Sequence, residues 1–180
     1  MFIGKNQDLA QALTETIKSF NANGWSPATS TNYSVRSATA NEYIISRSGV
    51  DKSLFSAKDL ILINEAGEVL PPFNCEGVKS SAETQIHTAL YARYPEINCV
   101  LHTHSVLGTV ISNGLLSRGK LTFKDLEILK GLDGNTTHET EEVLPIVPNS
   151  QSMDEIIKNM EEHFNSQNLH AFLIAGHGLY

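Results

Sequence analysis

Apolar residues recur at helical spacing in three parts of the chain. In the first part they are Leu9, Leu13, Ile17 and Phe20, and Asn23-Gly24 follows as a stop signal. A second helix is predicted over residues 80–94, where Ser80 and Glu83 stand at capping-box spacing and Pro95 ends the pattern. A third begins at a second capping box, Ser152 with Glu155, and its inward-facing residues are Ile156, Ile157, Met160 and Phe164.

Short apolar segments between turn residues predict strands, and they cover residues 43–45, 59–64, 68–70, 97–103, 143–147 and 171–175. The turn 64–67 joins two of them as a hairpin, and Pro145 favours an edge position for its strand. Residues 123–132 are predicted as a short helix, and residues 26–34 as a polar connection. Helices and strands are interspersed and the early strands are joined by short turns. The sequence therefore predicts an α/β or α+β fold with a mixed or largely antiparallel sheet.

Composition and charge narrow the class of protein. The chain has 180 residues, 41% of them hydrophobic, which suits one globular domain. A formal net charge of −7 without a basic stripe argues against a general nucleic-acid binder or an anionic-membrane binder. We see no apolar run long enough for a membrane span and no secretion signal. Two separated cysteines, Cys75 and Cys99, fit a reduced cytoplasmic setting.

The strongest chemical signal is the pair His102 and His104 at the end of a predicted strand. Alternate residues of a strand point to the same face, so two imidazoles can reach one metal ion. His177, between two glycines after another predicted strand, is the best third ligand. Three histidines with an open fourth position are typical of a catalytic zinc site. The competing interpretation is that these are ordinary histidines at strand ends.

The remaining titratable residues have plain interpretations as well as functional ones. His138 belongs to a polar loop, and His163 and His170 look like surface residues. His87, one turn after Glu83, is either a half-buried histidine or a partner of the metal site. Periodicity alone places Glu127 on a solvent-facing helix surface.

Three segments rich in hydroxyl groups offer a place for an anion, and they are residues 29–34, 46–49 and 79–81. The third lies at a predicted helix N-terminus, where unpaired amides and the helix dipole favour negative charge. Each segment alone is an ordinary turn or cap. Together with a metal site, they make a sugar-phosphate site plausible.

Several motifs, in this order along the chain, resemble the class II aldolase/adducin superfamily, and they are residues 28–36, 46–49, 81–84, 101–105, 126–132 and 176–178. The His-Thr-His-Ser segment and the later Leu-Glu segment are similar to the branch that dehydrates 5-methylthioribulose 1-phosphate in methionine salvage. The resemblance implies a three-layer α/β/α sandwich with a central, mainly antiparallel sheet. It also implies that residues 1–180 form a single domain lacking a C-terminal strand and helix, and that the protein is a homotetramer.

The resemblance further implies roles for single residues. It places one Zn²⁺ per subunit on His102, His104 and His177. It makes Glu127 the acid/base residue and Glu83 a second catalytic candidate, since the aldolase branch uses the matching position as its base. It puts the substrate phosphate near four residues, which are Asn32, Ser48, Gly49 and Ser81. Thr31 stands where relatives commonly have glycine, which predicts a stiffer loop.

Two other functions stay open, and a third is disfavoured. An aldolase or a 4-epimerase acting on another sugar phosphate would use the same metal ligands. An adducin-like interaction domain without enzymatic activity would not need them. A cupin-type metal protein would be almost entirely β, which the three predicted helices contradict.

Overall fold

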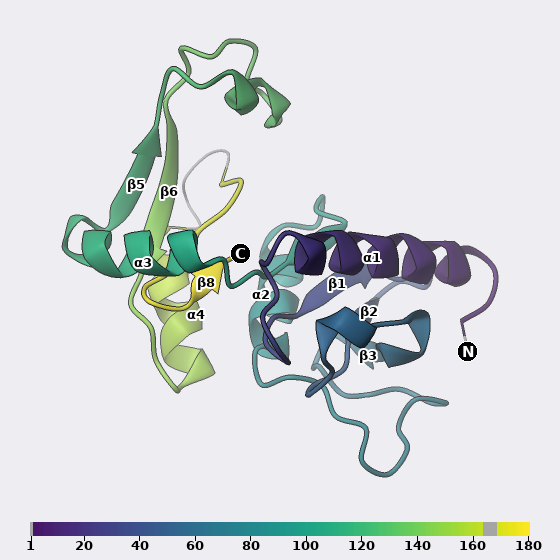
Figure 1. The fold of residues 1–180 in the computed structure, drawn as a ribbon. Helices are drawn as coiled ribbons and strands as arrows, with labels where there is room; N and C mark the ends of the chain where they lie inside the picture. Colours follow the sequence, from purple (N-terminus) through teal and green to yellow (C-terminus); the bar gives the residue numbers. More distant parts are fainter. Residues whose placement is uncertain (1, 164–168) are drawn as a thin grey trace. The chain divides into compact units, whose positions relative to one another are not determined.

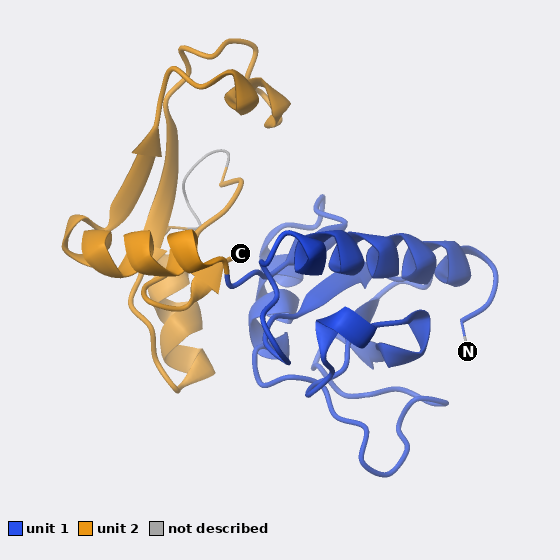
Figure 2. Cartoon of the chain, in the orientation of Figure 1, with its two compact units in different colours: residues 1–104 blue, residues 105–180 orange. Residues whose placement is uncertain are grey.

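Two four-stranded sheets form the framework of the part of the chain that the structure describes (Figure 1). The structure is a computed structural model, and it describes residues 2–163 and 169–180. The chain divides into two units, Met1–His104 and Ser105–Tyr180, each holding one sheet (Figure 2). The expected inward position of Phe164 lies outside the described residues.

The sheet of the first unit is antiparallel throughout. Its strand order is β3 (Leu60–Asn64), β2 (Glu42–Ser46), β1 (Tyr33–Arg36) and β4 (Cys99–Leu101). Strand β1 lies in the middle of the sheet, with Ser34 opposite Ile45 on one side and Val100 on the other. Strand β1 is not predicted by the local pattern, because Ser34 and Arg36 within it and Asn32 before it are polar. Pairing on both sides outweighs that weak local preference.

Helix α1 (Lys5–Ala22) covers this sheet, as the spacing of its apolar residues predicts. Leu13 and Ile17 are buried in one cluster with Tyr33 and Ile44 of the sheet. The helix ends at Ala22, and Asn23, the first residue of the predicted stop signal, is its C-cap.

Helix α2 (Thr84–Arg93) begins later than predicted, and the predicted capping box is wrong. The Ser80 hydroxyl donates to the carbonyl of Gly67, and the Glu83 side chain makes no cap hydrogen bond. The other end of the helix is tied to β1 by Arg36. Its guanidinium donates to the carbonyls of Tyr91, Tyr94 and Ile97 and lies 4.7 Å from the centre of the Tyr91 ring.

The second unit is built on a long two-stranded ribbon of β5 (Lys120–Phe123) and β6 (Glu142–Val147). Two short strands extend it, β7 (Leu173–Ile174) parallel to β6 and β8 (Gly178–Leu179) antiparallel to β7. The prediction of an edge strand at Pro145 is therefore wrong. The residue is tolerated because β7 begins opposite Ile146, so Pro145 is paired only with Lys120 of β5.

Two helices pack in the second unit, α3 (Val106–Leu115) and α4 (Met153–Glu161). The N-terminal cap of α4 is confirmed, since the Ser152 hydroxyl accepts from the Glu155 amide. Helix α3 is not predicted by the local pattern, because its apolar residues lie on all sides and two glycines interrupt them. Residues 127–131 form the 3₁₀ turn η4 (Glu127–Gly131), where a longer helix is predicted.

The mainly antiparallel α/β class is confirmed, with one parallel pair among the described strands. Short 3₁₀ turns complete the connections, and they are η1 (Lys52–Leu54), η2 (Ala57–Asp59) and η3 (Leu116–Arg118). Among the residues that the structure describes, no helix is both long and apolar enough to cross a membrane.

Candidate metal centre

His102 and His104 follow directly after strand β4, as the sequence predicts. The amide of His102 donates to the carbonyl of Asn32, and that of His104 to the carbonyl of Trp25, so the backbone stays extended past the strand end. Both imidazoles consequently fall on the same side. Their Nε2 atoms lie 2.7 Å apart, and the His102 side chain is fully buried.

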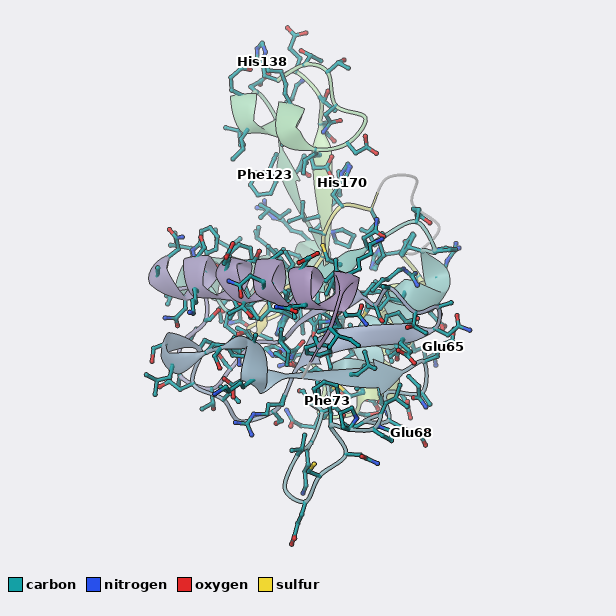
Figure 3. The ribbon with its side chains drawn as sticks, turned by 90° about the vertical axis from the view of Figure 1, so that its right-hand side faces the viewer. Glu65, Glu68, Phe73, Phe123, His138 and His170 are labelled. Carbon is teal, nitrogen blue, oxygen red and sulfur yellow. The ribbon has the colours of Figure 1, made fainter. Side chains whose placement is uncertain are left out.

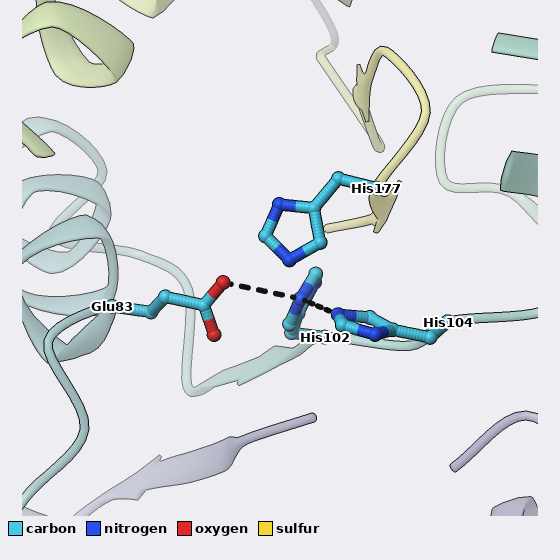
Figure 4. A group of neighbouring side chains, drawn as sticks. All are labelled: Glu83, His102, His104 and His177. Carbon is cyan, nitrogen blue, oxygen red and sulfur yellow. Dashed lines mark hydrogen bonds and ion pairs between the residues drawn. The ribbon is translucent and has the colours of Figure 1, made fainter. Parts of the chain in front are cut away.

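Glu83 approaches the same point from the start of α2 (Figure 4). Its Oε1 atom lies 3.7 Å from Nε2 of His102, and its Oε2 atom accepts a hydrogen bond from the side-chain amide of Asn32. The carboxylate that the sequence assigned to helix capping therefore faces the histidine pair instead.

These three side chains suit a divalent metal ion. Their ligand atoms all lie within 4.8 Å of one another. Two imidazole nitrogens on one tetrahedral zinc ion stand roughly 3.3 Å apart, given bonds of about 2.0 Å. The Nε2 atoms of His102 and His104 therefore need to move only slightly farther apart to bind the ion. Imidazole and carboxylate are ligands that zinc and related divalent ions accept.

His177 lies in the second unit, in the turn between β7 and β8. Its carbonyl accepts from the Thr109 hydroxyl, and the amide of Gly176 donates to the Ser112 hydroxyl, so α3 holds this turn from two points. Gly176 has a φ of 65°, which a β-carbon would make unfavourable. His177 is the third metal ligand that the sequence motif predicts. It belongs to the second unit, whereas the other three side chains of Figure 4 belong to the first.

The first unit also contains a cavity of about 190 Å³ that brings together the hydroxyl-rich segments of the sequence. All four residues expected near a phosphate line it, and they are Asn32, Ser48, Gly49 and Ser81. Glu83 and His104 line it too, so the cavity adjoins the candidate metal centre. Thr31, with a φ of 71°, holds a left-handed backbone that β-branched residues rarely adopt and that glycine, common at this position in relatives, adopts without strain.

Arg47 belongs to the predicted segment 46–49, but the sequence analysis gave it no role of its own. Among the described residues that line the cavity, it supplies the arginine or lysine cation. Its guanidinium lies 2.8 Å from Oδ1 of Asp59. Burial works against ionisation of that carboxyl, but hydrogen bonds from Ser56 and Arg47 outweigh it and lower the pKa of Asp59. The ion pair thereby fixes Arg47 at the cavity.

Glu127 lies in η4, and its side chain is 71% exposed. Nζ of Lys130 is 2.7 Å from its carboxylate, and Nδ1 of His138 is 3.8 Å away. His138 lies beyond Phe123, past the end of the β5–β6 ribbon (Figure 3). The plain interpretation of both Glu127 and His138 as solvent-facing agrees with these positions.

Two other histidines differ from their plain interpretations. His170 was expected on the surface, but Nδ1 lies 2.8 Å from Oε1 of buried Glu142 and Nε2 lies 2.9 Å from the carbonyl of Asp133. His87 was expected to be either half-buried or a partner of the metal site, and its side chain is completely buried beside Asn32. The sequence did not indicate this contact, because Ser80, three residues before Glu83, suggested that Glu83 completes a capping box.

The family model described as "Class II Aldolase and Adducin N-terminal domain" matches residues 11–180. The chain belongs to this family. The match includes both histidine motifs and every segment that lines the cavity, so the resemblance drawn from the motifs is confirmed.

Within this family, the chain is similar to curated proteins of one named activity. A methylthioribulose-1-phosphate dehydratase from Picosynechococcus is 44% identical over 98% of this chain and 82% of its own length. One from Stenotrophomonas maltophilia is 38% identical over 96% of this chain and 79% of its own.

Solved structures agree on the fold. The L-fuculose-1-phosphate aldolase from Thermus thermophilus has a TM-score of 0.70 at 24% identity, over 96% of this chain and 78% of that one. A sugar-phosphate aldolase from Thermotoga maritima has a TM-score of 0.69 at 16% identity, over 98% of this chain and 84% of that one. At these identities the likeness concerns the fold alone.

Proposed function

We propose that the protein is a hydro-lyase that dehydrates 5-methylthioribulose 1-phosphate to 2,3-diketo-5-methylthiopentyl 1-phosphate in methionine salvage. One observation carries the proposal: Glu83, His102 and His104 converge beside a hydroxyl-lined cavity in a chain 44% identical to a methylthioribulose-1-phosphate dehydratase. We place the protein in the cytoplasm, which the two free cysteines favour.

The metal in this proposal is Zn²⁺, held by His102, His104 and His177. When bound, it would polarise the substrate carbonyl at C2 and so acidify the proton at C3. The neighbouring Glu83 either completes the ligand set or acts as a base. Its hydrogen bond from Asn32 favours the ionised carboxylate that both roles need.

The substrate phosphate is assigned to the cavity of the first unit. Hydroxyl groups of Ser48 and Ser81 can donate to its oxygens, and Arg47 supplies positive charge. Gly49, with a φ of 76° and no side chain, leaves room for the phosphate close to the backbone. This placement puts the phosphate next to His104, which also lines the cavity.

Glu127 is assigned the proton transfers. Its carboxylate accepts the C3 proton, and the same proton leaves with the C4 hydroxyl as water. The enol that remains tautomerises to the diketone, so atoms and charges balance without another reactant. Exposure suits this role, because the carboxylate must reach a bound substrate.

The ribbon of the second unit separates Glu127 from His177. Strand β7, which leads to His177, pairs with β6 at Ile146 and Val147, whereas Glu127 follows the opposite end, where Phe123 faces Glu142. The five residue steps from Glu142 to Val147 span roughly 17 Å. We therefore propose that Glu127 serves the metal site of another copy, which agrees with the homotetramer that the resemblance implies.

Product identification by mass spectrometry tests the function. Zinc-loaded protein incubated with 5-methylthioribulose 1-phosphate should give a product lighter by one water, with the carbon chain intact. Shorter carbon fragments would instead identify an aldolase. An unchanged substrate would contradict the proposal, provided that the same sample retains zinc. The variant Glu127→Gln should retain zinc and lose turnover, while Glu139→Gln in the same loop should behave like the wild type.

A further inference from the structure

A chain of hydrogen bonds runs from Glu83 into the interior of the first unit. Oε2 of Glu83 accepts from the amide of Asn32, and Oδ1 of Asn32 meets Nε2 of His87. Nδ1 of His87 lies 2.7 Å from the Ser34 hydroxyl, which lies 2.9 Å from the hydroxyl of Tyr91. All members except Glu83 are buried, so water cannot replace these contacts.

The carboxylate fixes the direction of every bond in this chain. An ionised carboxylate only accepts, so the NH₂ group of Asn32 must face Glu83 and its oxygen must face His87. Nε2 of His87 must then carry the proton, which leaves Nδ1 as an acceptor. Ser34 consequently donates to Nδ1, and its oxygen accepts from Tyr91.

Burial keeps His87 in the form that this pattern needs. Loss of hydration lowers its pKa to about 3, although the nearby Glu83 charge opposes the change. The ring is therefore neutral near pH 7 and can donate at one nitrogen while it accepts at the other.

We propose that His87 is a positioning residue that holds the Asn32 amide with its NH₂ group toward Glu83, and thereby aims the Glu83 carboxylate at His102 and the metal. The proposal rests on the proposed function, since it assigns Glu83 to a working metal centre. If the amide turned over, its oxygen would face the carboxylate and the donor would be lost. The Nε2–H group of His87 opposes this, because the NH₂ group would then face a second donor unless the ring also moved its proton to Nδ1 and the Ser34 hydroxyl turned away.

Asn32 extends the effect to the substrate cavity. It is one of the residues that line the cavity, and its amide nitrogen has a second hydrogen besides the one that Glu83 accepts. The same amide orientation therefore serves both the carboxylate and an anion in the cavity. In this scheme His87 acts on the metal centre and on the substrate through Asn32.

The protonation pattern of His87 can be measured directly by nitrogen-15 NMR of the histidine rings, with the His87 signals assigned by their loss in His87→Gln. The expected result between pH 5 and 8 is a neutral ring with hydrogen on Nε2. A ring with hydrogen on Nδ1, or on both nitrogens, would overturn the proposal. This readout requires neither activity nor bound metal.

Substitutions test the consequence for the metal site. Gln at position 87 can still donate to Asn32 and accept from Ser34, whereas Leu can do neither. We expect His87→Leu to weaken zinc retention against a competing chelator about 10–100-fold, the usual effect of losing such a supporting contact. His87→Gln should stay within about threefold of the wild type. Equal losses in both variants would contradict the positioning role.

A control on the same helix separates positioning from general stability. Leu90 is buried in α2 but has no polar group, so Leu90→Ala should lower the unfolding temperature and leave zinc retention unchanged. Equal zinc loss in Leu90→Ala and His87→Leu would make the effect merely structural. A wild-type protein that shows the expected His87 ring and retains zinc, yet does not dehydrate the substrate, would contradict the proposed function alone.

Discussion

At the scale of single residues, the main feature of this protein is a series of buried polar side chains that form hydrogen bonds with one another. Ser34, His87 and Tyr91 lie in the interior, where an unpaired polar group would cost about 1–3 kcal/mol. Each instead satisfies the next, and the series ends at the Glu83 carboxylate. The interior of the first unit therefore supports the candidate site directly as well as the fold.

This arrangement predicts a dependence of stability on pH. The folded-state pKa of His87 is lowered to about 3 from an ordinary value of 6.5. Between these values the unfolded chain binds a proton that the folded chain does not, so acid favours unfolding. The contribution of His87 is fully present above about pH 6.5 and is lost as the pH falls toward 3, at up to about 1.4 kcal/mol per pH unit.

Urea unfolding between pH 7 and pH 4 measures the effect. His87→Gln has no titrating ring, so its free energy of unfolding should fall less steeply over this range. Parallel curves for the variant and the wild type would show that other groups cause the acid sensitivity. His163→Gln, in the second unit, serves as a matched control and should follow the wild type.

At the scale of elements, Arg36 joins strand β1 to the end of helix α2. Three carbonyls accept from its guanidinium, and the planar group also stacks on Tyr91. The last carbonyls of a helix have no partners within the helix, so this one side chain caps α2 from the sheet. The position of the helix that begins beside Glu83 thus depends on a contact at its opposite end.

Arg36→Lys should therefore be destabilising despite the conserved charge. An ammonium group cannot reproduce the planar set of donors, and we expect a loss of roughly 2 kcal/mol in the free energy of unfolding. Chemical denaturation checks this value. Arg118→Lys, at an exposed arginine of the second unit, should change it by less than about 0.5 kcal/mol. A similarly small change for Arg36→Lys would contradict the capping role.

The elements that sequence patterns predict well are those whose own residues determine them. Helix α1 and the start of α4 follow from apolar spacing and a capping serine, and both are confirmed. Strand β1 and helix α3 depend on partners distant in the chain, so local patterns miss them. The same distinction applies to the site. His102 and His104 are evident from strand alternation, whereas the role of His87 emerges only when β1 and α2 meet.

At the scale of the whole molecule, the proposed role of Glu127 predicts that copies of the chain assemble. If Glu127 serves another copy, no isolated chain contains a complete site. The exposed apolar residues of α3, with Val106, Leu107 and Val110 each more than half exposed, are consistent with contacts between copies.

Mixing two inactive variants tests this assembly. His102→Ala lacks a metal ligand and Glu127→Gln lacks the acid/base group, so each alone should be inactive. Refolded together, they should form sites with the metal ligands of one chain and Glu127 of another, and regain about a quarter of wild-type activity by random assembly. Refolding each variant alone provides the control. No recovery in mixtures shown to contain both chains would mean that Glu127 acts within its own subunit.

At the start of α2, the position of Glu83 in the candidate site leaves the helix without a side-chain cap. A serine and a glutamate stand at the spacing of a capping box there, and neither caps the helix. A side-chain cap is worth about 1 kcal/mol, so the helix begins with less stability than its sequence could provide. Directed evolution toward heat resistance alone should therefore favour substitutions at Glu83, whereas selection for growth on a methionine precursor should preserve it.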